Sequence, residues 1–200
     1  MREAPPGHTA INPALLVGLR VRLRQWTEAD NAPFAALNAD PVAMEFFPAT
    51  LTREQSDALA MRITAGIAER GWGMWAADHL PPEGGAPQFM GFIGLSSPVA
   101  DLPFKPCVEI GWRLLRPFWR QGLATEGARL ALRVGFEVLG LDEIVSFTTL
   151  HNARSRAVMT RLGIQESADD RFDHPSVPVG NPMRPHYLYR LPRARWAAST

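Results

Sequence analysis

The chain has 200 residues, of which 46% are hydrophobic and 20% are charged, and its formal net charge is +1. This length and composition suit one compact domain with a sizeable core, and the small net charge gives no electrostatic reason to expect nucleic acid or a membrane surface as a partner. The single cysteine, Cys107, excludes an internal disulfide framework and fits a reducing compartment. No apolar run approaches the roughly 20 residues that a membrane span needs. We therefore expect a soluble, cytoplasmic protein.

The residue pattern divides the chain into a short leader and one domain. Residues 1–14 lack the apolar core of a signal peptide, so we expect a flexible lead-in there. Residues 15–196 contain no internal repeat, no low-complexity segment and no linker long enough to divide them. One domain is expected over that range.

The first half of the chain begins with strand and helix signals. Residues 19–26 alternate in polarity as a strand does, and a capping box of Thr27 and Asp30 opens a helix. A second capping box, Thr52 with Gln55, begins a longer helix that runs to about residue 69. Three strand-like runs follow, at residues 72–77, 89–97 and 107–115, with a Pro- and Gly-rich hairpin loop at 80–88.

The second half of the chain alternates between strands and helices. A helix is expected from the turn at residues 116–122 to about residue 139, where Gly140 stops it. A strand, a short helix and a last strand follow at residues 143–150, 153–162 and 186–191, the last reached across a Pro-rich loop at 172–185. We therefore expect an α/β fold with a central mixed twisted sheet of about six to seven strands, flanked by about four helices.

The turn ahead of the first of these helices carries a functional signal. Gly122 breaks the preceding strand, and Ala124 is small enough to let a ligand approach the backbone. Free N–H groups at a helix start, with the helix dipole behind them, form an anion site. Arg120 beside the turn and Arg156 in the next helix add positive charge. A site for a phosphate-bearing ligand and a plain strand-to-helix turn both fit this pattern.

Glu109 is a carboxylate within an apolar strand. Alternation along the strand places Glu109 and Arg113 on one face and Ile110 and Trp112 on the other. A carboxylate in such a run is costly unless it is paired or takes part in chemistry. An ion pair with Arg113 and a role as a base are therefore the two interpretations.

Two segments resemble a known enzyme family. Residues 108–132, "VEIGWRLLRPFWRQGLATEGARLAL", and residues 151–164, "HNARSRAVMTRLGI", look like the GNAT superfamily of acetyl-CoA-dependent N-acetyltransferases, and within it the RimJ/RimL-like branch. The coenzyme loop of that superfamily reads Q/R-x-x-G-x-G/A, and Gly122 and Ala124 hold its fourth and sixth places. Trp119 holds the first place, as is usual in this branch, and Arg120 stands where the branch often has Gly.

The resemblance implies a GNAT-like fold and acetyl-CoA as the co-substrate. The backbone amides of the loop would hold the pyrophosphate of CoA, and the strand before it would pair its backbone with the pantetheine arm, as an added strand would. In RimL-like enzymes an N-x-x-S motif places the Asn on the pantetheine arm, while helix capping is the structural alternative for this Asn. The cofactor-binding residues expected in this way are Trp112, Arg113, Leu114, Arg120, Gln121, Gly122, Leu123, Ala124, Thr125, Asn152 and Arg156.

We expect direct transfer of the acetyl group to a primary amine in a ternary complex, because the sequence offers no convincing covalent nucleophile. Glu109 is expected to take the amine proton and Ser155 to support the leaving thiolate. Many GNAT enzymes carry a Tyr at the place held here by Met159, which cannot donate a proton. Cys107 has no His close in sequence, so we expect a small buried hydrophobe there rather than a nucleophile.

The acceptor stays open at this point. His174 and His186 border the late loop and are candidates for contact with the acceptor, and their spacing matches no metal site. A protein N-terminus, an amino acid, a polyamine and an antibiotic are all acceptors in the branch that the chain resembles. A homodimer is suggested by analogy only. A catalytically silent acyl-CoA-binding sensor and a non-CoA nucleotide-binding module are the alternatives to an enzyme.

Overall fold

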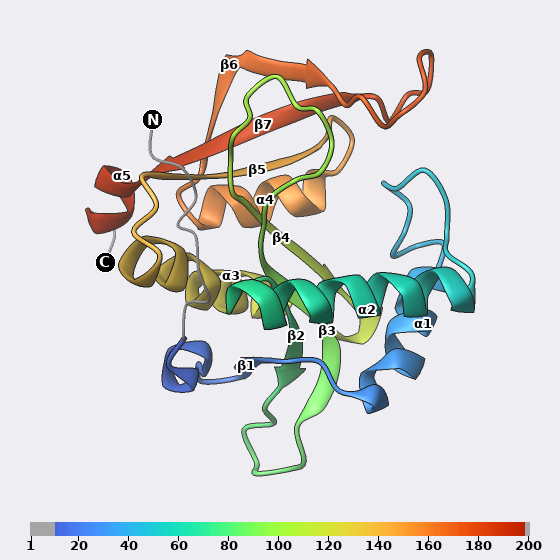
Figure 1. Cartoon of the computed structure of the whole chain (residues 1–200), viewed down its shortest axis with the longest axis vertical. Coiled ribbons are helices and arrows are strands. Elements are labelled where there is room, and N and C mark those ends of the chain that lie inside the picture. Colours follow the sequence, from blue (N-terminus) through green and yellow to red (C-terminus); the bar gives the residue numbers. More distant parts are fainter. Residues whose placement is uncertain (1–10, 199–200) are drawn as a thin grey trace.

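The computed structural model describes residues 11–198, except for the side chains of residues 167–169. Within these residues one seven-stranded mixed sheet has the strand order β1-β2-β3-β4-β5-β7-β6 (Figure 1). The strands are β1 (Val21–Arg24), β2 (Met74–His79), β3 (Gln88–Ser96), β4 (Glu109–Leu114), β5 (Glu143–Thr149), β6 (Gln165–Asp173) and β7 (Pro185–Pro192). The predicted α/β fold with a mixed sheet is confirmed.

Helices flank this sheet. The α-helices are α1 (Asn31–Ala39), α2 (Arg53–Arg70), α3 (Leu123–Arg133), α4 (Ala153–Arg161) and α5 (Arg193–Ala197). Three short 3-10 segments are η1 (Pro13–Leu16), η2 (Glu28–Asp30) and η3 (Arg116–Phe118), and one π-helical turn is η4 (Val134–Val138). Among the described helices, none combines the length and the apolar character that crossing a membrane requires.

The two predicted capping boxes are present. Thr52 accepts a hydrogen bond from the backbone N–H of Gln55, and the Gln55 side chain accepts one from the backbone of Thr52 at 2.9 Å, which starts α2. The box of Thr27 and Asp30 starts η2, which continues directly into α1. The helix expected to run to residue 139 ends its α-helical part at Arg133 and continues as the π-turn η4.

Strand β6 was not predicted, because its sequence "QESADDRFD" is polar and charged and shows no apolar alternation. It pairs only with β7 and forms an edge of the sheet, where charged side chains are tolerated and discourage pairing with other chains. The Pro-rich loop expected at residues 172–185 is correspondingly shorter, since Phe172 and Asp173 belong to β6.

The lead-in expected over residues 1–14 lies outside the described residues as far as residue 10. From there Asn12 caps η1 by accepting a hydrogen bond from the backbone N–H of Ala14 at 3.0 Å. The division into this leader and one domain over residues 15–196 stays a prediction.

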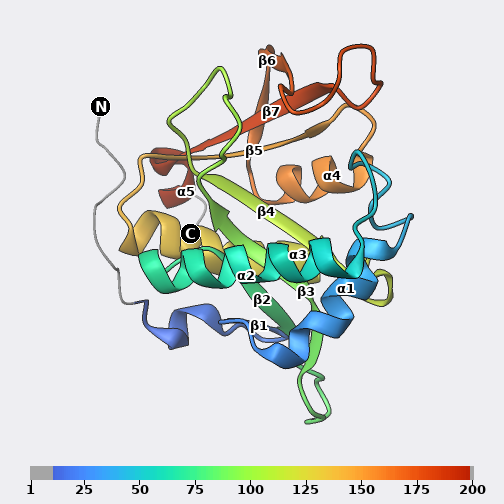
Figure 2. The ribbon, with the colours of Figure 1, turned by 45° about the vertical axis from the view of Figure 1, so that its right-hand side comes forward.

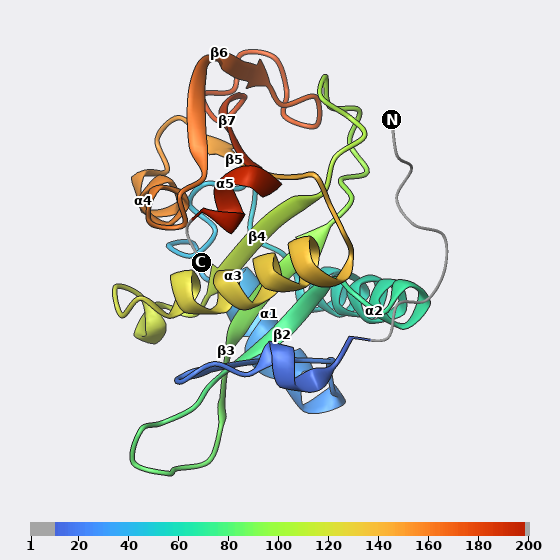
Figure 3. The same ribbon diagram turned by 90° about the vertical axis from the view of Figure 1, so that its left-hand side faces the viewer.

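The helices lie on both faces of the sheet (Figures 2 and 3). On β3, the Phe92 ring meets Phe34 of α1 edge-on, with the ring centroids 5.8 Å apart. The next residue, Ile93, points to the opposite face and lies against Gly127 of α3, where no side chain would fit. Alternation along one strand therefore separates a face covered by α1 and α2 from a face covered by α3.

The centre of the sheet is a fork between β4 and β5. These two parallel strands pair at a single position, Glu109 opposite Val145. Just beyond it the Ser146 hydroxyl donates a hydrogen bond to the carbonyl of Ile110 at 2.9 Å, in place of a further backbone pair. Since β4 leads through η3 into α3 and β5 leads into α4, both helices begin at the open end of the fork. This is the sheet edge where ligands of α/β proteins bind.

Candidate active site

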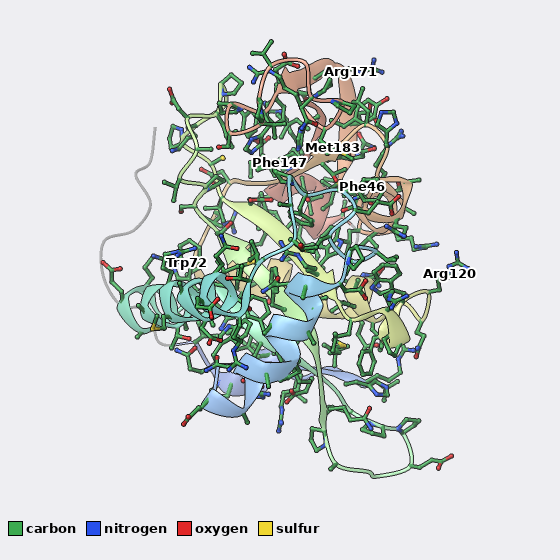
Figure 4. The ribbon with its side chains drawn as sticks, turned by 90° about the vertical axis from the view of Figure 1, so that its right-hand side faces the viewer. Phe46, Trp72, Arg120, Phe147, Arg171 and Met183 are labelled. Atoms are coloured by element: carbon green, nitrogen blue, oxygen red, sulfur yellow. The ribbon has the colours of Figure 1, made fainter. Side chains whose placement is uncertain are left out.

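A cavity of about 790 Å³ lies at this fork. Its walls come from β4, β5, the first turns of α3 and α4, the α1–α2 segment and the chain around the β6–β7 connection. Figure 4 shows three of the wall residues, Phe46, Phe147 and Met183, in one region, with Arg120 at the outer edge. The predicted site residues that line the cavity are Glu109, Trp112, Arg113, Leu114, Arg120, Gly122, Leu123, Ala124, Thr125, Asn152 and Ser155.

The loop before α3 is held in a tight left-handed conformation. Arg120 and Gly122 have φ angles of 61° and 79°, in the region that favours glycine. The first helical hydrogen bond runs from the N–H of Glu126 to the carbonyl of Gly122, and no side chain caps the helix. The N–H groups of residues 123–125 therefore have no partner among the described residues and point out of the helix start. An anion site at this helix start, which such free N–H groups can form, stays a prediction.

Arg20 fixes the position of this loop. Its Nη1 donates to the carbonyl of Gln121 at 3.0 Å, and its Nη2 forms an ion pair with Oε2 of Glu126 at 2.9 Å. Sequence reasoning missed Arg20, because it lies about a hundred residues away from its partners and a single basic residue before a strand is not distinctive. Gln121 itself does not line the cavity, since its side chain bonds to the carbonyl of Pro117 at 2.7 Å.

The N-x-x-S segment begins α4 as a cap. The Asn152 carboxamide accepts a hydrogen bond from the N–H of Ser155 at 3.1 Å and donates one to the Thr148 hydroxyl at 2.9 Å. The capping alternative is therefore confirmed, although Asn152 and Ser155 also line the cavity. Met159 is buried in the core and cannot serve in proton transfer.

The structure does not bring Arg156 to the cavity. Its Nε bonds to the Tyr189 hydroxyl at 3.1 Å, and its guanidinium lies over the ring of Tyr187. Arg154 takes the place at the cavity wall, where it stacks on Phe46 and Trp119 and pairs with Glu45 at 2.6 Å. Helical periodicity alone could not choose between these two arginines, because the partners come from distant segments.

Glu109 has no cationic partner among the described residues. Arg113 donates from Nη1 to the Asn38 carboxamide at 2.5 Å, so of the two interpretations of Glu109 the ion pair with Arg113 is wrong. Burial raises the pKa of the Glu109 carboxyl to about 7, an effect that the hydroxyl of Ser96, 3.3 Å away, partly opposes. A carboxyl on a cavity wall with such a pKa changes its protonation near neutral pH, as a general base must.

Cys107 is unsuited to act as a nucleophile. Burial and the neighbouring carboxylate of Glu109 raise the pKa of its thiol to about 11. The thiolate, which is the reactive form, is therefore scarce at neutral pH. This agrees with the expectation that Cys107 has no covalent role.

His174 and His186 both line the cavity, with ring centroids 5.0 Å apart. Nδ1 of His186 lies 2.9 Å from the carbonyl of Arg184, which can only accept, so this nitrogen carries the proton and Nε2 is free to accept. In His174, Nδ1 accepts from the N–H of Ser176 at 3.2 Å. Burial lowers the pKa of both imidazoles. They are neutral polar groups on this wall at physiological pH.

The raised pKa of Glu109 predicts a pH-dependent cost in stability. The folded-state pKa of about 7 lies above the ordinary value of 4.5, so the folded state favours the neutral carboxyl. The stability that this preference provides is present at low pH and is lost as the pH rises through 7. Glu109→Gln should therefore raise the unfolding free energy at pH 8 by at most about 3 kcal/mol, and with it the melting temperature. At pH 4.5 the substitution should change both little. Thermal unfolding at the two pH values measures this.

The exposed carboxyl of Glu69 on α2 offers a matched control. Glu69→Gln should leave the difference in melting temperature between the two pH values unchanged. Equal melting temperatures of wild type and Glu109→Gln at pH 8 would show that the Glu109 carboxylate is well solvated.

Two proteins of similar sequence are named as acetyltransferases. A segment of 69 residues, 34% of this chain, is 44% identical to the FsC-acetyl coenzyme A-N(2)-transacetylase of Aspergillus fumigatus and spans 29% of that protein. An uncharacterized N-acetyltransferase of Bacillus subtilis, YoaA, is 27% identical over 74% of this chain and 80% of its own length. The chain thus matches less than a third of the fungal enzyme and most of the bacterial protein.

Solved structures share the fold. A GNAT-family acetyltransferase from Bacillus anthracis superposes with a TM-score of 0.71 at 20% identity, over 90% of this chain and 98% of that one. A probable GNAT acetyltransferase from Chromobacterium violaceum gives a TM-score of 0.71 at 21% identity, over 98% and 95% of the two chains. The family model for the acetyltransferase (GNAT) domain matches residues 20–165, which include β4, α3, β5 and α4 in full. The chain belongs to the GNAT family of acetyltransferases.

Proposed function

We propose that this protein transfers an acetyl group from acetyl-CoA to a primary amine, with both substrates bound at once. The observation that carries the proposal is the cavity, in which the free amides of α3, the fork of β4 and β5 and the carboxyl of Glu109 share one space. The cavity is lined by the α1–α2 segment as well as by the start of α3, which cover opposite faces of the sheet, so two substrates have room to meet there. The absence of a reactive thiol at Cys107 supports direct transfer over a covalent route.

The donor side of the proposal rests on the fork and the helix start. The N–H groups of residues 123–125, together with Arg120, are placed to bind a pyrophosphate. The backbone of Trp112, Arg113 and Leu114 faces the gap left by β5, where an extended amide-containing arm can add as a strand. Trp119 supports the edge of this site, because its indole N–H bonds to the carbonyl of Leu114 at 2.7 Å.

In the proposed reaction Glu109 accepts a proton and Ser155 donates a hydrogen bond. Acetyl-CoA supplies an activated acetyl thioester, whose carbonyl carbon forms a bond to the amine nitrogen while its bond to sulfur breaks. Glu109 takes the proton that the amine nitrogen loses, either directly or through one water. The thiolate that leaves lies near the first turn of α4, where the Ser155 hydroxyl donates a hydrogen bond to it.

The proposed branch of the family and the proposed location rest on features of the sequence. The Trp119 variant of the coenzyme loop supports placement in the RimJ/RimL-like branch. The single cysteine supports a reducing, cytoplasmic location. The amine is a protein N-terminus or a small molecule.

An amine panel tests the proposed activity. Purified protein is mixed with acetyl-CoA and with amino acids, polyamines, aminoglycosides and short peptides, and free CoA is followed with a thiol reagent. CoA release that depends on the amine, with the acetylated product found by mass spectrometry, is the expected result. Tight binding of acetyl-CoA without turnover of any amine would favour the silent sensor, and failure to bind acetyl-CoA would refute the proposal.

The coenzyme loop predicts a strong effect of Gly122→Val. A β-branched residue does not tolerate a φ of 79°, so the loop must rearrange and move the N–H groups of residues 123–125. We expect the Kd for acetyl-CoA to rise by about 10-fold or more, the scale of one lost charge-assisted hydrogen bond. Isothermal titration calorimetry measures the change.

Gly163 provides the control for backbone strain. Its φ of 75° is nearly the same, and open space surrounds the position of an added Cβ. Gly163→Val should lower stability to a similar extent and leave the affinity for acetyl-CoA unchanged. Equal affinities in both variants would mean that the loop does not bind the coenzyme.

The role of Glu109 predicts the pH dependence of turnover. In wild type, kcat should rise with pH through about 7, as the Glu109 carboxyl ionises. Glu109→Gln should lower kcat about 100-fold and remove this limb, while the affinity for acetyl-CoA stays near normal. Ser155→Ala should lower kcat less, because water can replace the hydroxyl. A Glu109→Gln variant with wild-type kcat and the same pH profile would transfer the role of base to His174 or His186.

A further inference from the structure

Arg113 is a buried cation without an anion. No carboxylate pairs with it among the described residues, and its Nε is a buried donor with no hydrogen-bond partner. Burial lowers the pKa of the guanidinium to about 10, which still leaves it charged at neutral pH. An enclosed charge without a counter-ion is destabilising, so proteins seldom retain one that has no function.

The guanidinium is held firmly in place. Nη1 donates to Oδ1 of Asn38 at 2.5 Å, and Nδ2 of Asn38 donates to the hydroxyl of Ser56 at 2.9 Å. Asn38 and Ser56 are fully buried. The hydrogen bonds connect Ser56 of α2 through Asn38 of α1 to Arg113 of β4. The Phe47 ring stacks on the guanidinium with 3.9 Å between its centroid and Cζ, and Phe92 lies at 5.2 Å. None of these groups carries a negative charge.

Part of this guanidinium remains open to the cavity. Arg113 lines the cavity, and among the described residues its Nη2 has no hydrogen-bond acceptor. Phe47, whose side chain covers the guanidinium, is 40% exposed and comes from the segment between α1 and α2. A ligand in the cavity can therefore reach the charge from the side of α1, which is the face opposite α3.

We propose that Arg113 binds a carboxylate of the amine acceptor, so that the acceptor is an amine that also carries a carboxylate. This inference rests on the proposed acetyltransferase function and names the class of its second substrate. A guanidinium with free N–H groups on a low-dielectric wall binds a planar carboxylate through charge-assisted hydrogen bonds. Glu109 and Arg113 lie on the same face of β4, with only Gly111 between them on that face. The reacting amine and the carboxylate would thus bind at the two ends of one strand face.

The test compares amines that differ in charge at one end. The substrates are 4-aminobutanoate and 6-aminohexanoate, each paired with its carboxamide, and kcat/KM is measured with saturating acetyl-CoA. Wild type should prefer each carboxylate over its carboxamide by about 10- to 100-fold, mainly through KM. Arg113→Gln should abolish this preference by lowering kcat/KM for the carboxylates and not for the carboxamides. Arg113→Lys should keep part of the preference. An equal ratio in wild type and Arg113→Gln would overturn the inference while leaving the acetyltransferase function intact.

A second variant neutralises the guanidinium without removing it. Asn38→Asp places a carboxylate of nearly the same shape beside Nη1. Its second oxygen replaces the Nδ2 donor, so the Ser56 hydroxyl must turn and donate the hydrogen bond that it accepts in the wild type. We expect the preference for carboxylates to fall as in Arg113→Gln. The control Arg53→Gln, which removes an exposed arginine paired with Asp57 on α2, should change nothing.

A binding experiment separates this inference from the proposed function. The same four compounds are titrated into the protein saturated with acetyl-CoA, and binding is followed by calorimetry. If no amine is acetylated, the proposed function fails, yet tighter binding of the carboxylates by wild type than by Arg113→Gln would still support the carboxylate site. Equal binding of carboxylates and carboxamides by wild type would refute it.

Discussion

The rest of the site depends on the parting of β4 and β5 after a single backbone pair. Two parallel strands that stayed paired would fill the centre of the sheet and leave no room for a ligand. Because they separate, residues of both strands line the cavity. The first turns of α3 and α4 lie on either side of its opening. The hydroxyl of Ser146 satisfies the carbonyl of Ile110 at the point of separation, so the fork is stabilised without a ligand.

The same fork explains why two ionisable groups of β4 have no partner of opposite charge. Glu109 and Arg113 share a strand face but lie too far apart to pair, since four residues of a strand advance by about 13 Å. Each is surrounded by neutral groups instead, Ser96 near Glu109 and Asn38 with Phe47 near Arg113. The protein thus keeps two ionisable groups of opposite sign at a distance on the wall of one cavity, where their burial strengthens their interactions with a ligand.

Local sequence patterns predicted the features that depend on neighbours in the chain. The capping boxes of Thr52 and Thr27, the turn at Gly122 and the alternation of β4 all follow from residues a few positions apart. What the sequence did not show depends on contacts between distant segments. Arg20 at the loop, Arg154 rather than Arg156 at the cavity and Asn38 rather than Glu109 beside Arg113 are of this kind. Strand β6 escaped prediction because an edge strand needs no apolar alternation.

The wall of the cavity that faces α1 comes largely from side chains outside the sheet. Phe46 and Phe47 belong to the segment between α1 and α2, and they are held by stacking on Arg154 and Arg113 rather than by strand pairing. Glu109, by contrast, is fixed by the sheet itself. Changes in that segment can therefore reshape this wall of the cavity while Glu109 keeps its position. A scaffold built in this way allows substrate choice to diverge between relatives at little cost to the acyl-transfer geometry that they inherit.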